Sequence, residues 1–423
     1  MKVYKFGGAS VSSAERIKNV ADIIENEAGN ELLIVISAMG KTTNALEKVA
    51  EEFFEGNNNN ALALFEIIKN DHIAILQNIV TINKAIAIDH LKDFFTEIEW
   101  LLHDKPVQEF DYYYDQIVCI GELLSTAIIS DYFKERNILN NWIDVRDIIR
   151  TDDNFRDGNV DIIYTSKMCT EALIPLFKNS PIIITQGYIG STDENESTTL
   201  GREGSDYTAA LLANICNAES LTIWKDVKGI MNADPKQFQE AILIKDLGFK
   251  EVIEMAYYGA QVIHPKTIKP LQNKNIPLYV KCFLDTSLPG TLISNTISHN
   301  LPPIFVLKEK QVLLNLSTKD FSFIGESSVS DLYEIFAELK LKPNLTQNGA
   351  INFMVCLDDL PEKIEKLALK ASDFFDVHLE RDLTLLSIRH YTEEKLQELK
   401  EGRKIVLEQR TPNTVLVLMR SNN

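Results

Sequence analysis

Lysine, glycine and serine residues near the N-terminus have the spacing of a phosphate-binding turn. The segment Lys5-Phe6-Gly7-Gly8-Ala9-Ser10 ends a short apolar strand and precedes a segment of helical periodicity. Glycines let backbone N–H groups approach a phosphate at a helix N-terminus, and Lys5 would add an ammonium group. The Gly-x-x-x-x-Gly-Lys-Ser/Thr spacing of a Walker loop is absent. The glycines alone are equally compatible with a tight strand-to-helix turn that binds nothing.

A second glycine-containing loop, residues 199–206, lies directly before an apolar helix predicted over 207–216. Arg202 in this loop can hold a carboxylate through two parallel hydrogen bonds, and Ser205 lies at another positive helix end. Asp206 would orient a lysine rather than contact a substrate. By itself, Asp206 also fits the ordinary preference for an acid in a first helical turn. The loop therefore predicts a site for a carboxylate.

The elements around these loops follow an α/β pattern. From Met1 to about Asn295, short β-branched runs alternate with helical segments, which predicts a mostly parallel sheet. A Ser12-x-x-Glu15 capping box predicts the start of the first helix. Residues from about Asn44 to Asp131 have helical periodicity, interrupted by a polar run at 57–60 that predicts a loop. Buried strands are expected at 32–36, 182–185 and 221–224.

A second domain is expected after the α/β region. A polar segment follows Pro289-Gly290 and ends in Pro302-Pro303, and an alternating strand begins near 312. We therefore expect an α/β domain over 1–295, with a helical insertion at about 44–131, and a smaller domain over 305–423.

Composition narrows the class of protein. The 423 residues are 45% hydrophobic and 25% charged, which suits a folded chain of two or three domains. A formal net charge of −18 opposes nonspecific binding to nucleic acid or to an anionic membrane. Purely apolar runs stop short of the roughly 18 residues that span a bilayer. No secretory signal is visible, so a cytoplasmic location is expected. The five scattered cysteines predict reduced thiols and no zinc site.

Several motifs, taken in order, resemble the aspartate kinase family of the amino acid kinase superfamily. The resemblance spans residues 1–295, and the ordered set is far more specific than either glycine loop. It implies the amino acid kinase fold, a three-layer αβα arrangement around a mostly parallel sheet. The motifs are Lys5 to Gly8, Gln186 to Ser191, Thr198 to Asp206, Trp224 to Ile230 with Asp234-Pro235-Lys236, Gly259 to Thr267, and Pro289 to Ile293.

The resemblance also implies an activity. It predicts ATP-dependent phosphorylation of the side-chain carboxylate of L-aspartate to 4-phospho-L-aspartate, which leads to lysine, threonine and methionine. No general base is expected, because the attacking carboxylate is already ionised at neutral pH. The reaction instead needs positioning and charge neutralisation. Mg²⁺ would be carried by ATP, and no protein metal site is expected.

Roles for individual residues follow from the same resemblance. Lys5 would stabilise the transferred phosphoryl group, and Asp206 would hold Lys5 in place. Arg202 would bind the α-carboxylate of aspartate, and Glu122 would bind its ammonium group. Without the resemblance, Glu122 fits a solvated helix carboxylate better. The aspartate pocket would be completed by Ser37, Thr43, Gly204 and Ser205. The nucleotide would contact Lys5, Gly7, Gly8, Ser10, Lys225, Asp226, Met231, Lys236, Gln261 and Val262.

Some of these positions depart from the family pattern. Met231 stands where tyrosine is common, Lys236 where arginine is common, and Gln261 where lysine is common. Threonine is often found in place of Lys225. Glu203 fills a variable position that is often glycine or asparagine, so its carboxylate must point away from the anionic substrates or be paired. His264 is interpreted as structural, because no nucleophile in this reaction needs it.

The C-terminal region resembles the ACT modules that end members of this family. Each module is a small βαββαβ unit, and the second one looks shortened because one charged helix, 393–401, precedes the last strands. Half-sized sheets leave strand edges that need a partner, so a homodimer or larger assembly is expected. In lysine-sensitive relatives an aspartate on the second strand helps to hold lysine. Asn344 stands there in this chain, which predicts weak inhibition by lysine or none.

Two other functions compete with this interpretation. One is an amino acid kinase that acts on glutamate or acetylated glutamate, because the fold does not set the substrate. The long helical insertion and the ACT-like region argue against it. The other is a catalytically silent amino-acid-binding subunit, which would predict loss of Lys5, Arg202 or Asp206. All three residues are present.

Overall fold

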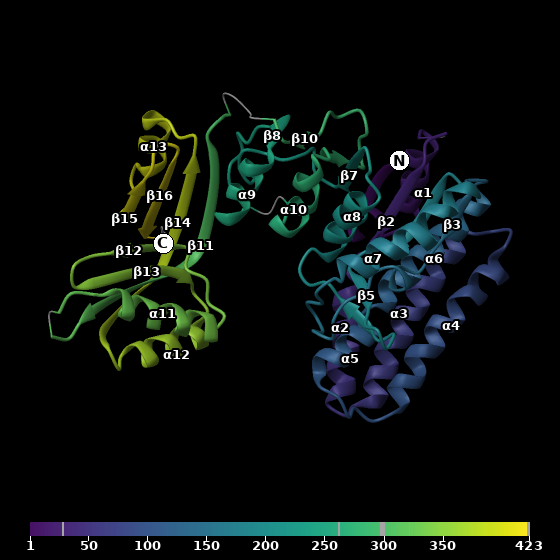
Figure 1. The fold of residues 1–423 in the computed structure, drawn as a ribbon, viewed down its shortest axis with the longest axis horizontal. Coiled ribbons are helices and arrows are strands. Elements are labelled where there is room, and N and C mark those ends of the chain that lie inside the picture. The colour runs from purple at the N-terminus through teal and green to yellow at the C-terminus, as the bar shows by residue number, and fades with distance from the viewer. Residues whose placement is uncertain (28, 261–262, 297–300, 321, 421–423) are drawn as a thin grey trace. The chain divides into compact units, whose positions relative to one another are not determined.

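The chain forms two compact units (Figure 1). The computed structural model describes residues 1–27, 29–260, 263–296, 301–320 and 322–420. The first unit comprises Met1–Ile230, Leu243–Ile253 and Ile263–Ser298, and the second comprises Met231–Ile242, Glu254–Val262 and His299–Asn423. Two short segments that the sequence analysis assigns to the α/β domain thus cluster with the C-terminal residues.

The first unit is built on an eight-stranded sheet in the order β3-β4-β2-β1-β7-β9-β10-β8. Neighbouring strands from β3 to β9 are all parallel, whereas β10 runs antiparallel to β9. A mostly parallel sheet is covered on both faces, which explains why its central strands are buried at nearly every position. The strands are β1 (Lys2–Phe6), β2 (Leu32–Ile36), β3 (Asn140–Trp142), β4 (Ile182–Gln186), β7 (Ser220–Lys225), β8 (Asp246–Gly248), β9 (Leu278–Cys282) and β10 (Thr291–Ser294).

Different helices cover the two faces of this sheet. Successive side chains of a strand point to opposite faces. Lys5 pairs with Asp206 of α8 on one face, whereas Gln186, aligned with Phe6 through β2, donates to Thr126 of α6 on the other. The predicted three-layer αβα fold is therefore confirmed. The helices of the region are α1 (Ala14–Glu25), α2 (Thr42–Phe54), α3 (Asn58–Ile79), α4 (Lys84–His103), α5 (Phe110–Val118), α6 (Ile120–Glu135), α7 (Ile162–Met168), α8 (Gly204–Ile215), α9 (Phe249–Tyr257) and α10 (Pro265–Lys274).

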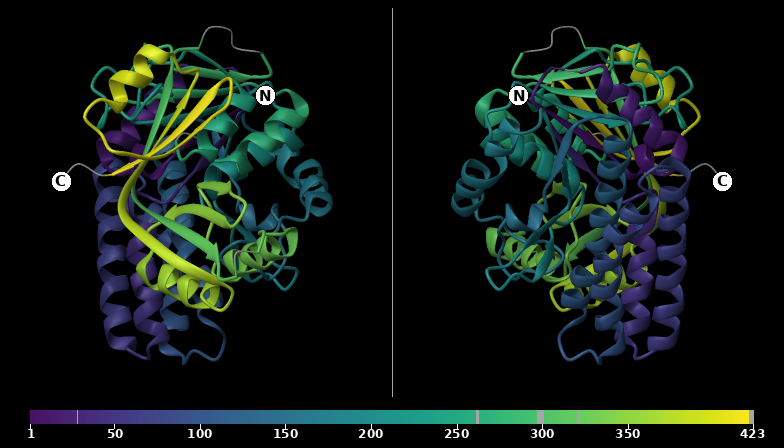
Figure 2. Two further views of the ribbon diagram at one scale, coloured as in Figure 1. Left: turned by 90° about the vertical axis from the view of Figure 1, so that its left-hand side faces the viewer. Right: turned by 90° about the vertical axis from the view of Figure 1, so that its right-hand side faces the viewer.

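Helices α2 to α6 form the insertion expected at about 44–131, and Figure 2 shows them in purple to blue from two sides. The polar run at 57–60 was predicted to be a loop, but α3 already begins at Asn58. Asparagine is tolerated at a helix start, where backbone N–H groups lack intrahelical partners. The run Phe110–Glu135 is long and apolar enough to cross a membrane by composition, yet 94% of its apolar window is buried, as in a core helix.

The start of α1 also differs from the sequence prediction. The predicted capping pair was Ser12 and Glu15, but Ser13 is the N-cap and its hydroxyl accepts the backbone N–H of Arg16. Ser12 instead donates to the carbonyl of Ala9. Residues Gly8–Val11 form a short 3₁₀ turn between β1 and α1. Ser12 ends this turn, so the N-cap of α1 falls on the next residue, Ser13.

The second unit contains a six-stranded antiparallel sheet in the order β12-β13-β11-β14-β16-β15. The elements from β11 to β14 follow one another as βαββαβ, and α11 and α12 bury one face of this part. After β14, the described residues form one helix and two strands. The elements are β11 (Ile304–Thr318), α11 (Glu326–Glu338), β12 (Leu345–Asn348), β13 (Asn352–Asp358), α12 (Pro361–Ala371), β14 (Phe375–Arg389), α13 (Glu393–Lys400), β15 (Ile405–Arg410) and β16 (Thr414–Arg420).

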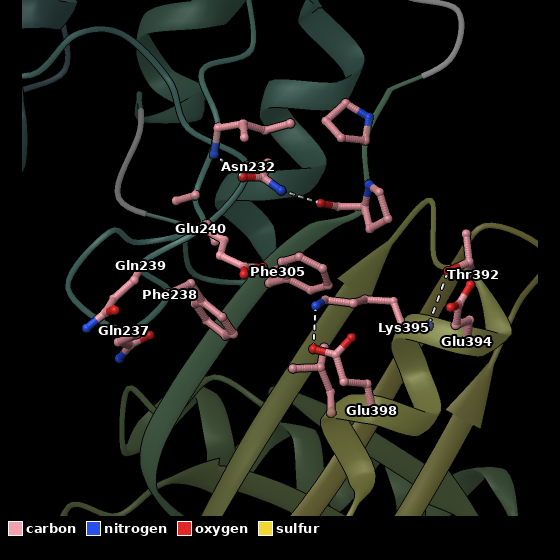
Figure 3. Close-up of a pocket in the computed structure, with 16 residues that line it drawn as sticks. Asn232, Gln237, Phe238, Gln239, Glu240, Phe305, Thr392, Glu394, Lys395 and Glu398 are labelled. Carbon is pink, nitrogen blue, oxygen red and sulfur yellow. Dashed lines mark hydrogen bonds and ion pairs between the residues drawn. The ribbon is translucent and has the colours of Figure 1, made fainter.

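Residues 231–242 lie over the part of this sheet that has a single helix. Ala233 belongs to the same buried cluster as Leu396 of α13. A cavity of about 590 Å³ lies between this segment and α13 (Figure 3). Phe238 and Phe305 stack in its wall with ring centroids 5.5 Å apart. None of the residues expected to bind aspartate lines this cavity.

Candidate active site

The residues expected to bind aspartate and the phosphates lie on loops and helix starts at one edge of the parallel sheet. Strands β4, β2, β1 and β7 are neighbours, and Gln186, Ile36, Phe6 and Trp224 are aligned across them. The loops that follow these four residues therefore start side by side. In open α/β sheets, ligands bind outside the carboxyl ends of the strands. The loops carry Ser37 after β2, the glycines Gly7 and Gly8 after β1, Gly187 after β4, and Lys225 at the end of β7.

Lys5 and Asp206 form a buried ion pair at this edge. The Nζ atom of Lys5 lies 2.6 Å from Oδ1 of Asp206, and Lys225 Nζ lies 3.8 Å from Oδ2. Lys5 is 8% exposed and Asp206 is 3% exposed. Burial alone would raise the pKa of Asp206, but the two ammonium groups outweigh it and hold the pKa below its usual value. The structure thus brings together the predicted lysine and its orienting aspartate.

The glycine loop after β1 makes a close approach that a side chain would block. A Cβ atom on Gly8 would lie 2.7 Å from the carbonyl oxygen of Ala38, and Gly40 donates its N–H to the carbonyl of Gly8 at 3.0 Å. Ser10 is fully buried, and its hydroxyl donates to the carbonyl of Trp224 at 3.4 Å. Its backbone N–H donates to Gly7 at 2.8 Å. The hydroxyl of Ser10 thus joins the loop to β7, and its backbone N–H closes the loop turn.

Glu122 is a buried carboxylate with one free oxygen. It lies in the first turn of α6, is 2% exposed, and accepts the N–H of Ala38 on Oε1 at 3.3 Å. Its Oε2 atom has no hydrogen-bond partner among the described residues. Burial raises the pKa of Glu122 to about 8, only partly offset by hydrogen bonds and the nearby Lys5. The solvated helix carboxylate that the sequence alone favoured is therefore excluded.

Ser37 and Thr43, the two polar residues expected to complete the aspartate pocket near Glu122, differ in their contacts. The carbonyl of Ser37 accepts a hydrogen bond from the hydroxyl of Ser125, one turn after Glu122, so Ser37 lies beside that helix. Thr43 is half-buried in the first turn of α2. Its side chain makes no hydrogen bond with any residue in the described ranges.

The loop before α8 presents Arg202 to solvent. Arg202 is exposed and forms no hydrogen bond or ion pair with any residue that the structure describes. Glu203 is the N-cap of α8 in the left-handed region, with φ of 54°. Its carboxylate accepts the backbone N–H of His264 at 3.0 Å, so it is paired, one of the two outcomes expected for this position. His264 caps α10 through Nδ1, which accepts the N–H of Lys266, in agreement with a structural histidine.

The first residues of α8 complete this side of the site. Gly204 packs so tightly that an added Cβ would lie 2.6 Å from the ring of Tyr188. Ser205 is buried at 8% exposure in the same turn. The first N–H groups of a helix have no intrahelical partners and carry partial positive charge. The loop can therefore attract a carboxylate through Arg202 and through the helix end.

The residues expected to bind the nucleotide are only partly brought together. Lys225 and the exposed Asp226 belong to the first unit, beside the glycine loop. Met231 and Lys236 belong to the second unit, where the backbone N–H of Lys236 donates to Asp234 at 2.9 Å. Gln261 and Val262 lie outside the described residues. Across the described ranges, no group of three or more His, Cys, Asp or Glu side chains could hold a metal ion.

One residue that the sequence analysis missed is Asp115 on α5. Its carboxylate is fully buried and accepts hydrogen bonds from the Arg202 loop, which begins at Thr199. Burial raises its pKa to about 6. An acid inside the apolar run from Tyr112 to Leu124 is the sequence signal that could have identified it.

The comparisons with known proteins agree with this geometry. The model of the amino acid kinase family matches residues 1–282. Lysine-sensitive aspartokinase 3 of Escherichia coli is 32% identical over 91% of this chain and 86% of its own length. The chloroplastic aspartokinase 1 of Arabidopsis thaliana is 31% identical over 86% of this chain, which spans 64% of that protein.

A solved structure shows the same overall similarity. The crystal structure of E. coli aspartokinase III in complex with aspartate and ADP superposes with a TM-score of 0.83, at 28% identity. The match covers 99% of this chain and 96% of that one. The family model covers residues 1–282, and the E. coli relative matches nearly the whole chain. This chain therefore belongs to the amino acid kinase family and, within it, to the aspartokinases.

Proposed function

We propose that this chain transfers the γ-phosphoryl group of ATP to the side-chain carboxylate of L-aspartate. The observation that carries the proposal is a carboxyl group and a guanidinium group at the same sheet edge, each with capacity that no described residue uses. Oε2 of Glu122 has no hydrogen-bond partner among the described residues and can accept an ammonium group, and the Arg202 guanidinium forms no hydrogen bond or ion pair with them and can bind a carboxylate. This pair matches the two charges of an α-amino acid. The likeness to an aspartokinase solved with aspartate and ADP supports the choice of substrates.

The described residues supply charge stabilisation and positioning. Lys5, held by Asp206 at 2.6 Å, would face the transferred phosphoryl group beside the glycine loop. The N-terminus of α8 adds partial positive charge next to Arg202. A fixed ammonium in a water-poor site stabilises a dispersed negative charge without reorganising. The side-chain carboxylate of aspartate attacks in line and is already ionised, so proton abstraction is not needed.

We further propose that Mg²⁺ reaches the site on the nucleotide. Mg²⁺ in such enzymes is bound through substrate phosphates and few protein carboxylates. Gly7, Gly8, Ser10, Lys225, Asp226, Met231, Lys236, Gln261 and Val262 remain the proposed nucleotide contacts. We propose that the enzyme works in the cytoplasm as a homodimer or larger assembly.

The proposed function is tested by trapping the acyl phosphate. Incubation with ATP, Mg²⁺ and L-aspartate in the presence of hydroxylamine should yield aspartyl hydroxamate, and L-glutamate should react far less. The Lys5→Met variant serves as the inactive control. Equal turnover of the two amino acids, or turnover of neither, would contradict the proposal.

A further inference from the structure

Asp115 joins the helical insertion to the loop that carries Arg202. Its Oδ2 atom accepts the backbone N–H of Thr199 at 2.8 Å, and Oδ1 accepts the hydroxyl of Thr199 at 2.7 Å. Oδ2 also accepts the backbone N–H of Arg156 at 2.9 Å. Asp115 is 0% exposed. One buried carboxylate therefore satisfies three donors, two of which belong to the residue that begins the Arg202 loop.

The rest of this loop is held by other parts of the first unit. The N–H of Leu200 donates to Tyr188 at 2.8 Å, and the carbonyl of Leu200 accepts Lys266 Nζ at 3.0 Å. The carbonyl of Thr199 accepts the N–H of Gly158 at 2.9 Å. With Glu203 bonded to His264, the loop is fixed on both sides of Arg202. The Arg202 guanidinium forms no hydrogen bond or ion pair with the described residues.

Asp115 also has a fixed relation to Glu122. Helices α5 and α6 follow each other with only Cys119 between them, and Glu122 comes seven positions after Asp115. The two carboxylates thus lie on one nearly continuous, buried helical segment. Asp115 ties the loop of Arg202 to the segment that carries Glu122. Among the contacts that hold the loop, those of Asp115 are the ones that come from the helical segment of Glu122.

We propose that Asp115 is a positioning residue that fixes Arg202 against Glu122 and so makes the site select aspartate over glutamate. The selectivity rests on the proposed function. If Glu122 and Arg202 hold the α-ammonium and α-carboxylate, the substrate side chain alone must reach the phosphoryl group beside Lys5. Glutamate is longer by one methylene, a difference that a rigid site can use for about 10- to 200-fold discrimination. A loop that shifts can accommodate the longer side chain.

The test compares kcat/KM for L-aspartate and L-glutamate in full-length variants. Asp115→Ala leaves two backbone N–H groups buried without partners, so the aspartate-to-glutamate ratio should fall about tenfold or more. The KM for aspartate should rise about tenfold, while the KM for ATP should stay within about twofold. Asp115→Asn keeps one side-chain oxygen that can accept both backbone N–H groups, and the new side-chain NH₂ can donate to the hydroxyl of Thr199. The aspartate-to-glutamate ratio of kcat/KM should therefore stay within about threefold of the wild-type value.

Asp161→Ala is the matched control. Asp161 also accepts two backbone N–H groups, those of Ile163 and Tyr164, but it caps α7 and does not contact the Arg202 loop. This variant should keep the wild-type ratio. If Asp115→Ala does not fold, Thr199→Val removes the hydroxyl bond alone and should give a smaller fall in the same direction. An unchanged aspartate-to-glutamate ratio in Asp115→Ala and Thr199→Val, or equal losses for both substrates in these two variants, would overturn the proposal.

Amide hydrogen exchange separates failure of this inference from failure of the proposed function. Peptides covering residues 199–205 should exchange faster in Asp115→Ala than in Asp161→Ala, whatever substrate the enzyme uses. Unchanged exchange would show that Asp115 does not hold the loop. Suppose that the wild-type enzyme phosphorylates no aspartate and that exchange is still faster in Asp115→Ala. The proposed function and the selectivity would then be wrong, whereas the structural role of Asp115 in holding the loop would stand.

Discussion

Lys5 combines burial with full charge compensation, which few lysines do. Removing an ammonium group from water is costly unless it is paired, and Asp206 at 2.6 Å supplies the pair. Asp206 is shared with Lys225, so two positive charges converge on one negative charge. The local excess of positive charge suits an incoming phosphoryl group. An enzyme with a formal net charge of −18 needs such a local positive site to bind an anionic nucleotide.

Replacing Lys5 with methionine should remove this charge while keeping most of the side-chain volume. We expect kcat to fall more than tenfold with a modest change in ATP affinity, because the charge matters most in the transition state. Arg202→Ala should chiefly raise the KM for aspartate, because a carboxylate contact acts in the ground and transition states alike. Steady-state kinetics on both variants measure this contrast. Retention of more than about a tenth of wild-type turnover by Lys5→Met would contradict its electrostatic role.

Glu122 should make aspartate binding depend on pH. Its pKa is raised to about 8, so the free enzyme holds it mostly neutral at pH 7, and an ammonium group binds only the ionised form well. The KM for aspartate should therefore fall as pH rises from 6.5 towards 8 and level off above that. The slope should approach about tenfold per pH unit at its steepest.

Glu122→Gln provides the control for this profile. The variant cannot ionise at position 122, so its KM for aspartate should be higher and nearly flat over the same range. Asp115, with a pKa raised to about 6, titrates mainly below this window. A wild-type KM that stays constant between pH 6.5 and 8 would show that Glu122 does not bind the substrate ammonium.

At the scale of elements, the junction of β11, β12 and β13 holds a closed polar network. Asn344, just before β12, donates to Gln311 and to Asp358, both at 2.8 Å. Its side-chain oxygen accepts Lys308 Nζ at 2.8 Å. The ammonium group of Lys308 thus occupies the side-chain oxygen of Asn344, and the side-chain NH₂ of Asn344 donates both of its hydrogen bonds within the protein. A free lysine would have to displace Lys308 to bind there.

This network supports the expectation of weak inhibition by lysine or none. Asn344 also lacks the charge that roughly doubles the strength of a hydrogen bond to an ammonium group. Initial rates with saturating ATP and aspartate near its KM should stay nearly unchanged as lysine rises into the millimolar range. The titration is repeated with threonine to detect another effector. Strong inhibition by submillimolar lysine would show that this interpretation is wrong.

At the scale of the whole molecule, the second unit exposes large apolar side chains. Strands β12 and β15 are the outermost strands of its sheet. Phe323, Leu369 and Phe374 are 82%, 73% and 60% exposed. Exposed apolar surface of this kind is commonly covered by a partner. A second copy of the chain is the simplest partner, because most soluble oligomers are symmetric homo-oligomers.

We expect a homodimer or larger assembly at micromolar concentration. Multi-angle light scattering on the full chain gives the mass directly. A Leu369→Glu, Phe374→Glu variant should shift the distribution towards monomer, whereas Trp100→Glu, which changes an exposed side chain of the first unit, should not. A monomeric wild-type protein at micromolar concentration would reject the assembly.

The sequence by itself determined the features that depend on local pattern. Apolar runs such as 32–36 and 221–224 predicted central strands, because strands buried on both faces cannot alternate. Ordered glycine-containing motifs indicated the family, because close backbone approaches such as that at Gly8 tolerate no other residue. The pairing of Lys5 with Asp206 was implied by the same motifs. The nucleotide contacts of Met231, Lys236, Gln261 and Val262 stay predictions.

Tertiary structure alone decided the features that depend on residues far apart in the chain. The short strand β12 was not predicted, because it pairs only with β13 and carries little apolar pattern. The solvated interpretation of Glu122 failed because its burial comes from packing of the loop at Ala38, 84 residues away. Asp115 was missed because its role depends on Thr199, which lies 84 residues further along the chain. Burial and hydrogen-bond partners are properties of the folded neighbourhood, and one-dimensional spacing does not contain them.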